Sequence, residues 1–196
     1  MIKTTAMILE ELHEYASPKN KLSRLVKQGR YIPIVKGIYE TDKTVPGYLL
    51  AGSIYGPSYL SFDYALSSYG LIPEAVYTYT CATFDKKKAK RYETPFGVFS
   101  FRDVPAAVYA EGVELRQEGE YWYRIASPEK ALCDKLYTLS PVNNARELQT
   151  LLSEDLRVDE DGLHSLDYRT IEKLSEKYRA TNIRKLCTIL RRMQNE

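Results

Sequence analysis

The sequence predicts an α+β protein in which a short winged-helix-like module precedes a larger α+β domain with a small antiparallel sheet and a helical C-terminal part. Two observations lead to this expectation. A short amphipathic helix and a β-hairpin follow one another directly in residues 22–39, and strand-like alternation gives way to helical periodicity near residue 127. The polar stretch 41–46 ends in a Pro-Gly pair, so we place the domains at 1–42 and 43–196. The first is too short to bury a core alone and should dock on the second.

The N-terminal module should contain two helices and one hairpin. Apolar residues recur at helical spacing in residues 4–15. Ser17-Pro18 can start a second helix, because serine caps helices and proline suits their first position, and Gly29 can end it. The β-branched residues between Tyr31 and Glu40 predict the hairpin, with its turn at Lys36-Gly37.

The larger domain should alternate short helices and strands before its helical tail. Its expected elements are helices over 46–56 and 61–70, strands over 76–84 and 94–102, a hairpin over 113–125 and a strong helix over 127–140. The charged segment DKKKAKR (85–91) is expected to be a loop, and the chain from residue 144 onward should be almost entirely helical. Short connections favour antiparallel pairing of the strands.

Composition indicates a soluble cytoplasmic protein. The 196 residues carry a net charge of only +2, and their three cysteines are far apart, which argues against a disulfide framework or a zinc site. No apolar run approaches the roughly 20 residues that span a bilayer. The N-terminus is amphipathic and acidic, without the apolar centre of a signal peptide. We therefore expect no membrane partner.

Positive charge is concentrated between Ser17 and Tyr39, where there are six basic residues and no acidic one. Such a surface can neutralise several phosphates and place a helix in the major groove. We therefore predict a DNA-binding surface made of Lys19, Lys21, Arg24, Lys27, Arg30 and Lys36. A solvated amphipathic helix is the alternative. A possible secondary basic patch comprises Lys86, Lys87, Lys88, Lys90 and Arg91, which could equally be a solvated hairpin tip that discourages edge-to-edge strand pairing.

The sequence offers no catalytic constellation. His13 and His164 are isolated, and no phosphate-binding loop, HExxH or GxSxG motif occurs. The acidic run from Glu154 to Asp161 lacks the register of a calcium-binding loop and is expected to be a solvated turn. We expect a protein that is not an enzyme and that holds no metal or cofactor.

Three blocks of the chain, LSRLVKQGRYIPIVKGIYE (22–40), SYLSFDYALSSYGLIPE (58–74) and IASPEKALCDKLY (125–137), carry a family resemblance. In this order they resemble the antitoxins of the AbiEi type, which belong to the type IV toxin–antitoxin systems of abortive infection. Residues 22–40 match a reading helix of the form LxRLxxxG that leads into a wing ending in GxY, and residues 58–74 resemble the helix that opens the second domain of that family. Residues 125–137 (IASPEKALCDKLY) resemble its A-x-PEKALxD helix. The matching positions are Leu22, Arg24, Leu25, Gly29, Gly37, Tyr39, Pro128, Glu129, Lys130, Ala131, Leu132 and Asp134.

The resemblance implies a two-domain antitoxin for phage defence. Its first domain would bind operator DNA at its own promoter and repress transcription, and its second would neutralise a nucleotidyltransferase-like toxin without a stable complex. The chain departs from the family because Ser17-Pro18 leaves no room for a middle helix, so the turn of the helix-turn-helix should be absent. Phosphate contacts would survive that loss more easily than base contacts. The alternative is a protein or RNA interaction module with a degenerate N-terminal wing.

Overall fold

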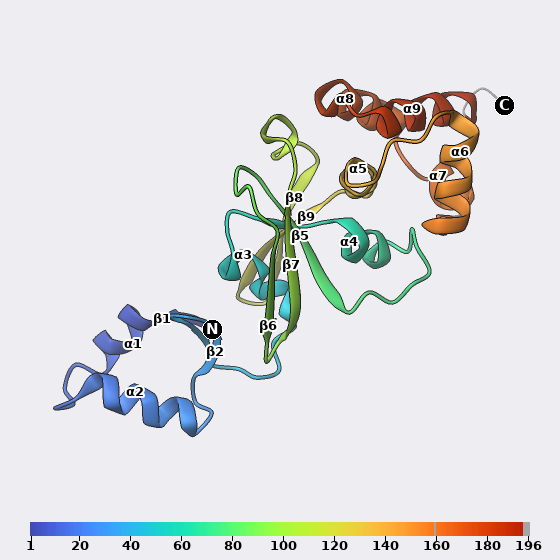
Figure 1. The fold of residues 1–196 in the computed structure, drawn as a ribbon. Helices are drawn as coiled ribbons and strands as arrows, with labels where there is room; N and C mark the ends of the chain where they lie inside the picture. Colours follow the sequence, from blue (N-terminus) through green and yellow to red (C-terminus); the bar gives the residue numbers. More distant parts are fainter. Residues whose placement is uncertain (159, 194–196) are drawn as a thin grey trace.

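The computed structural model describes residues 1–158 and 160–193 and shows an α+β protein with two sheets (Figure 1). The N-terminal module stands at one end of the molecule. Its elements are β1 (Ile2–Thr4), α1 (Thr5–Glu11), α2 (Pro18–Lys27), β2 (Ile32–Val35) and β3 (Ile38–Glu40). The three strands form an antiparallel sheet in the order β1-β3-β2.

Local signals explain the two helices of this module. The Thr4 side chain accepts a hydrogen bond from the Met7 backbone N–H and caps α1, while Pro18 occupies the first turn of α2. Gly29, at a φ of 74°, ends α2 in the left-handed region that favours glycine. The helices bury a small cluster of their own, separate from the main core and made of Ile8, Leu12, Leu22, Leu25 and Tyr31.

The N-terminal module differs from the prediction in one respect. β1 was not expected, because a three-residue strand has too little alternation to be recognised without its partner β3. No helix lies in residues 12–17, where the sequence left no room for a middle helix. α1 and α2 are consecutive helices joined by residues 12–17, and they pack against each other through their shared apolar cluster. Two helices, rather than three, precede the hairpin.

The larger domain is built on a six-stranded mixed sheet in the order β6-β7-β5-β4-β9-β8. The strands are β4 (Tyr59–Leu60), β5 (Thr78–Thr83), β6 (Lys90–Thr94), β7 (Gly97–Asp103), β8 (Val113–Glu118) and β9 (Tyr121–Ala126). The predicted small antiparallel sheet is therefore wrong in size and partly in direction. β5 runs parallel to β7, and β4 runs parallel to β9, because the intervening segments cross over rather than turn back. Lys90 and Arg91, expected in a loop, belong to β6.

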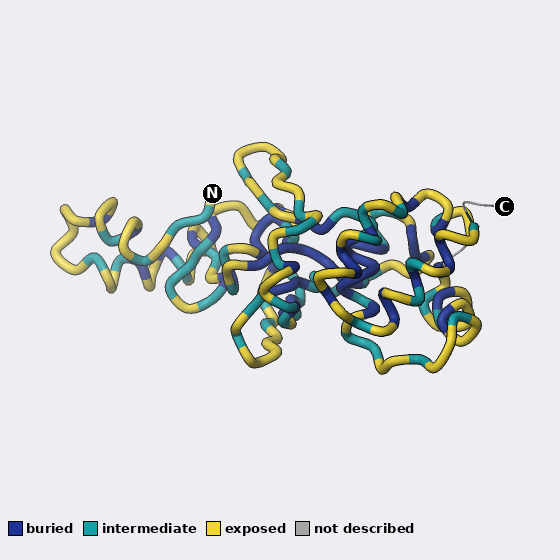
Figure 2. Tube along the Cα trace, turned by 90° about the horizontal axis from the view of Figure 1, so that it is seen from above, coloured by how far each residue is buried: buried dark blue, intermediate teal, exposed yellow. Residues whose placement is uncertain are grey.

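Helices cover both faces of this sheet and form the predicted C-terminal tail. The helices are a 3-10 helix over Gly47–Leu50, α3 (Ala51–Ile54), α4 (Phe62–Ser68), a 3-10 turn over Ala106–Val108, α5 (Pro128–Tyr137), α6 (Ala145–Thr150), a π-helical turn over Leu151–Asp155, α7 (Glu160–His164), α8 (Tyr168–Tyr178) and α9 (Thr181–Met193). α3 lies on one side of the sheet, and α4 and α5 lie on the other (Figure 1). The buried residues run through the body and its tail, whereas most of the N-terminal end is exposed (Figure 2). No helix in the described part of the chain is long and apolar enough to cross a membrane.

Candidate nucleic-acid interface

The exposed face of α2 carries most of the predicted DNA-binding residues. Leu22 and Leu25 are buried in the cluster shared with α1, which fixes how the helix is turned about its axis. At 100° per residue, Arg24 and Lys27 lie on the side opposite this apolar face, together with Asn20. All three are exposed. Asn20 was not singled out in the sequence, yet its amide can pair with a base edge from this position.

The structure places the six predicted cations on one continuous stretch of chain. Lys19, Lys21, Arg24 and Lys27 lie on α2, Arg30 lies in the link to β2, and Lys36 lies in the β2–β3 turn. Five are exposed, and Lys21 is half-buried with its Nζ 4.6 Å from the ring centroid of Tyr15. Among the described residues, none of the six forms an ion pair. Their charge is therefore open to an external anion.

The β2–β3 hairpin is attached directly to the start of α1. The Gly37 carbonyl accepts hydrogen bonds from the Thr5 backbone N–H at 2.9 Å and from Thr5 Oγ1 at 3.3 Å. Gly37 has a φ of 86°, which the tight turn requires and which a side chain would strain. The exposed Lys36 is consequently held at a turn whose position relative to the helices is fixed by backbone contacts.

The secondary basic patch does not form one free surface. Lys86 Nζ donates to the Gly56 carbonyl at 2.9 Å and lies 5.2 Å from the ring centroid of Tyr55. The backbone N–H groups of Lys86 and Lys87 both donate to the Asp103 carboxylate at 2.7 Å. These contacts give Lys86 a structural role and hold the loop against β7. Lys87 and Lys88 are exposed in the loop. Lys90 and Arg91 are also exposed but belong to the edge strand β6.

The centre of the larger domain contains a buried charge network that the sequence did not reveal. Asp134 accepts hydrogen bonds from Lys130 Nζ at 2.8 Å, from Ser61 Oγ at 2.6 Å and from the Tyr59 hydroxyl at 3.0 Å. The Tyr178 hydroxyl also donates to Asp134, and it accepts a hydrogen bond from Lys130. Both charged side chains are fully buried. The only signal was the i,i+4 spacing of lysine and aspartate, which usually marks a surface pair.

Burial shifts the proton equilibria of this network. Desolvation lowers the pKa of Lys130, against the opposing attraction of Asp134. Desolvation, followed by the Asp134 charge, raises the pKa of Tyr59 and of Tyr178, so both phenols stay protonated in the folded protein. With its charged groups shielded from solvent, the network joins α5 to β4 and α8, and we assign it a structural role.

Other residue types supply little further chemistry. Cys81 and Cys133 are buried, Cys187 is half-buried, and all three are free thiols. Within residues 1–158 and 160–193, no three His, Cys, Asp or Glu side chains are grouped so that they could hold a metal ion. Asp159, in the acidic run, lies outside the described residues. Neither protein-family models nor curated proteins match this chain.

Proposed function

We propose that the N-terminal module is a reduced winged helix that binds DNA, with α2 as the helix that enters the major groove. The observation that carries this proposal is the exposed face of α2, where Arg24 and Lys27 have no acidic partner and flank a polar Asn20. A helix-turn-helix needs two consecutive helices, the second of which contacts bases. The consecutive helices α1 and α2 support this proposal, with α2 in the second position, and two helices precede the hairpin where a full module has three.

The second part of the proposal is that the protein acts as the antitoxin of a type IV system and regulates its own operon. It rests on the resemblance of residues 22–40, 58–74 and 125–137 to that family. The last two blocks meet in space, since Ser61 of one donates a hydrogen bond to Asp134 of the other. Such a contact is what is expected of two blocks that build one shared core. The partners would be operator DNA and a nucleotidyltransferase-like toxin.

A protein or RNA interaction module is the competing function. Aromatic and aliphatic side chains exposed on the β8–β9 hairpin favour it, because Trp122 and Leu115 are each 59% exposed. Exposed tryptophan is enriched at interfaces between macromolecules. In this alternative the N-terminal module packs on the body and makes no use of its charge.

Gel-shift titrations with DNA from upstream of the gene distinguish these functions. If all six cations contact phosphates, log Kd should change with log salt concentration with a slope of about 5. Arg24→Ala and Lys27→Ala should each lower that slope by about 1. Asn20→Ala should weaken specific binding more than binding to unrelated DNA. Lys173→Ala on α8 is the control, because this exposed lysine lies in the C-terminal tail. Equal effects of Arg24→Ala and Lys173→Ala would refute the DNA-binding proposal.

Co-expression tests the antitoxin role separately from DNA binding. A neighbouring nucleotidyltransferase gene should be toxic when expressed alone and tolerated when expressed with this protein. Because the proposed protective activity resides in residues 43–196, Arg24→Ala should weaken operator binding and leave protection intact. Failure of the wild-type protein to protect would exclude the antitoxin role whatever the gel shifts show.

A further inference from the structure

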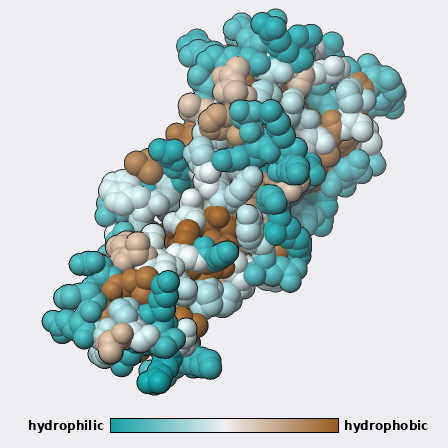
Figure 3. Space-filling model, turned by 60° about the vertical axis from the view of Figure 1, so that its left-hand side comes forward, coloured by the Kyte–Doolittle hydropathy of each residue, from teal (hydrophilic) through white to brown (hydrophobic). Residues whose placement is uncertain are grey.

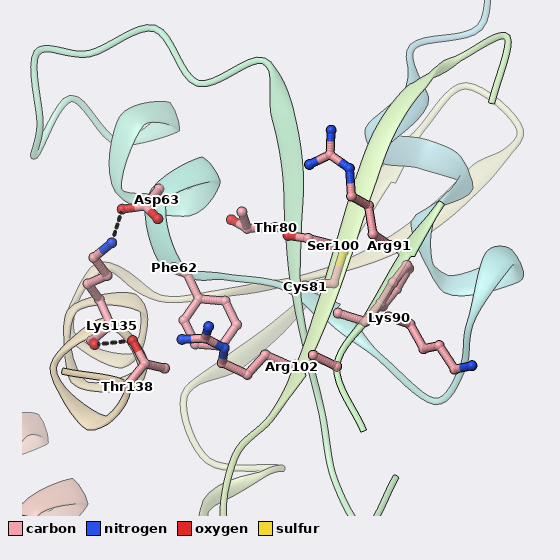
Figure 4. Close-up of a pocket in the computed structure, with 12 residues that line it drawn as sticks. Phe62, Asp63, Thr80, Cys81, Lys90, Arg91, Ser100, Arg102, Lys135 and Thr138 are labelled. Carbon is pink, nitrogen blue, oxygen red and sulfur yellow. Dashed lines mark hydrogen bonds and ion pairs between the residues drawn. The ribbon is translucent and has the colours of Figure 1, made fainter. Parts of the chain in front are cut away.

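The end of the secondary basic patch, at Lys90 and Arg91, borders a cavity of about 400 Å³ on the face of the large sheet that α4 and α5 cover incompletely (Figure 4). Its floor is formed by the edge strand β6 and its neighbours β7 and β5, and its wall by residues of α4 and α5. Across the sheet, Arg91 pairs with Ser100, which pairs with Thr80. Arg102 lies two residues beyond Ser100 on the same strand, so these side chains share one face of the sheet.

Charge in this cavity is strongly unbalanced. Four of its lining residues are cations and one is an acid: Lys90, Arg91, Arg102, Lys135 and Asp63. Lys135 Nζ pairs with Asp63 Oδ1 at 2.6 Å, which neutralises one of the four. Arg91 Nε lies 3.4 Å from Glu93 in a pair that is mostly exposed and therefore weak. Because Lys90 points away from the cavity, Arg91 and Arg102 supply the charge that remains for an anion (Figure 4).

Arg102 and Ser100 have unused hydrogen-bonding capacity. Both side chains line the cavity, and neither makes a hydrogen bond to another described residue. Figure 4 shows Arg102 extending from β7 toward Phe62 and Thr138, with Arg91 on the other side of Ser100 and Lys90 pointing away. The Arg102 guanidinium and the Ser100 hydroxyl, both on one face of β7, suit a phosphate, because arginine donates paired hydrogen bonds to its oxygens.

The wall of the cavity formed by α4 carries an acidic and an apolar side chain, in contrast to the basic Arg102 on the floor. Asp63 uses one carboxylate oxygen for Lys135 and presents its acidic side chain to the cavity. A carboxylate repels a second phosphate but accepts hydrogen bonds from sugar hydroxyls, as acidic residues do in nucleotide sites. Phe62 lies between the two ends and adds an apolar surface. Along a nucleic-acid backbone the charge repeats at every step, so this acid argues for a ligand charged at one end.

We propose that this cavity binds a phosphorylated sugar of nucleotide size, with its phosphate at Arg102 and Ser100 and its hydroxyls toward Asp63. The volume falls within the range of about 300–1,000 Å³ typical of small-molecule sites. Mononucleotides and simple sugar phosphates share this chemistry. The site lies in the body, apart from α2, and does not depend on the DNA-binding proposal.

Isothermal titration of the full chain with AMP, ribose 5-phosphate, adenosine and inorganic phosphate tests the site. AMP or ribose 5-phosphate should bind saturably, and adenosine should not. Arg102→Ala should weaken binding about tenfold or more, the effect of losing a charge-assisted hydrogen bond, and Ser100→Ala should weaken it less. Arg146→Ala on α6 is the matched control, since this arginine is exposed and does not line the cavity. Thermal melts establish that each variant is folded.

Comparison of the ligands identifies the source of the phosphate. Tighter binding of AMP than of ribose 5-phosphate assigns a nucleotide, and equal binding assigns a sugar phosphate. The proposal is overturned if neither ligand binds at millimolar concentration, or if Arg102→Ala and Arg146→Ala act alike. It is also overturned if a short single-stranded oligonucleotide binds in the cavity more tightly than the mononucleotide, because the site would then be a nucleic-acid groove.

Discussion

In the buried Lys130–Asp134 pair, removing the carboxylate should destabilise the fold more than removing the ammonium. Asp134→Leu leaves the Lys130 ammonium buried with only the Tyr178 oxygen, and it removes the acceptor used by Ser61 and Tyr59. We expect a cost of about 3–5 kcal/mol. Lys130→Met leaves Asp134 with three hydroxyl donors, so the expected cost is about 1–3 kcal/mol.

The penalty in Asp134→Leu has an upper limit set by proton release. At pH 7 a lysine with an ordinary pKa of 10.5 can lose its proton for about 5 kcal/mol, so a neutral Lys130 caps the electrostatic cost. In that case the unfolded state binds one proton more than the folded state. The stability of this variant should then rise with pH between 7 and 9 by about 1.4 kcal/mol per unit. The double variant, Lys130→Met with Asp134→Leu, should be more stable than Asp134→Leu alone.

Urea denaturation followed by circular dichroism measures these differences. Lys135→Met is the control, because its ion pair with Asp63 is partly exposed and should contribute less than about 1 kcal/mol. Equal costs for Lys130→Met and Asp134→Leu would refute the assignment of Asp134 as the centre of the network. Two outcomes would show that the buried ammonium is not the source of the penalty. One is a stability of Asp134→Leu that does not change with pH, and the other is a double variant less stable than Asp134→Leu.

Two further predictions concern stability, and each follows from one structural feature. The free energy of unfolding should fall above pH 10. Tyr59 and Tyr178, whose pKa values are raised, keep their protons in the folded state, while the same phenols lose theirs in the unfolded state. Each tyrosine should lower the free energy of unfolding by about 1.4 kcal/mol per pH unit. The lowered pKa of Lys130 opposes this loss only up to its unfolded value of 10.5. Urea denaturation should therefore give a lower free energy of unfolding at pH 11 than at pH 9, and equal values would contradict this prediction. Gly47→Ala should cost about 1–3 kcal/mol, since its Cβ would lie 2.3 Å from both the Phe96 carbonyl oxygen and Tyr79 Cε2. Gly52→Ala, where nothing lies within 4 Å, should be neutral or stabilising in the same thermal melts, and equal effects at the two glycines would rule out this steric explanation.

The elements that the sequence predicts well are those specified by local chemistry. Pro18 and Gly29 bracket α2, and the Ser127 side chain caps α5 by accepting from the Lys130 backbone N–H at 3.3 Å. The β8–β9 hairpin follows from its Glu118-Gly119 turn, where the glycine has a φ of 57°. Each of these signals lies within a few residues of the structure that it determines.

The elements that the sequence does not predict depend on distant partners. β4 is only two residues long, and it becomes a strand because Leu60 pairs with Cys81 on one side and Ile125 on the other. The parallel pairing of β5 and β7 requires the chain to place β6 at the sheet edge, which no local pattern indicates. The cavity was missed for the same reason, since Arg102 and Lys135 are ordinary surface residues until the sheet and α5 bring them together.

The buried network also indicates which surfaces should determine function. Ser61, Lys130 and Asp134 are buried in the core. These residues act on the packing of the domain, because a buried ion pair with matching hydroxyl donors constrains its neighbours closely. Ligands must instead meet exposed residues such as Arg24 on α2 and Arg102 at the cavity. Substitutions at these two arginines therefore test binding directly, whereas substitutions in the PEKALCD segment test the stability of the domain that presents them.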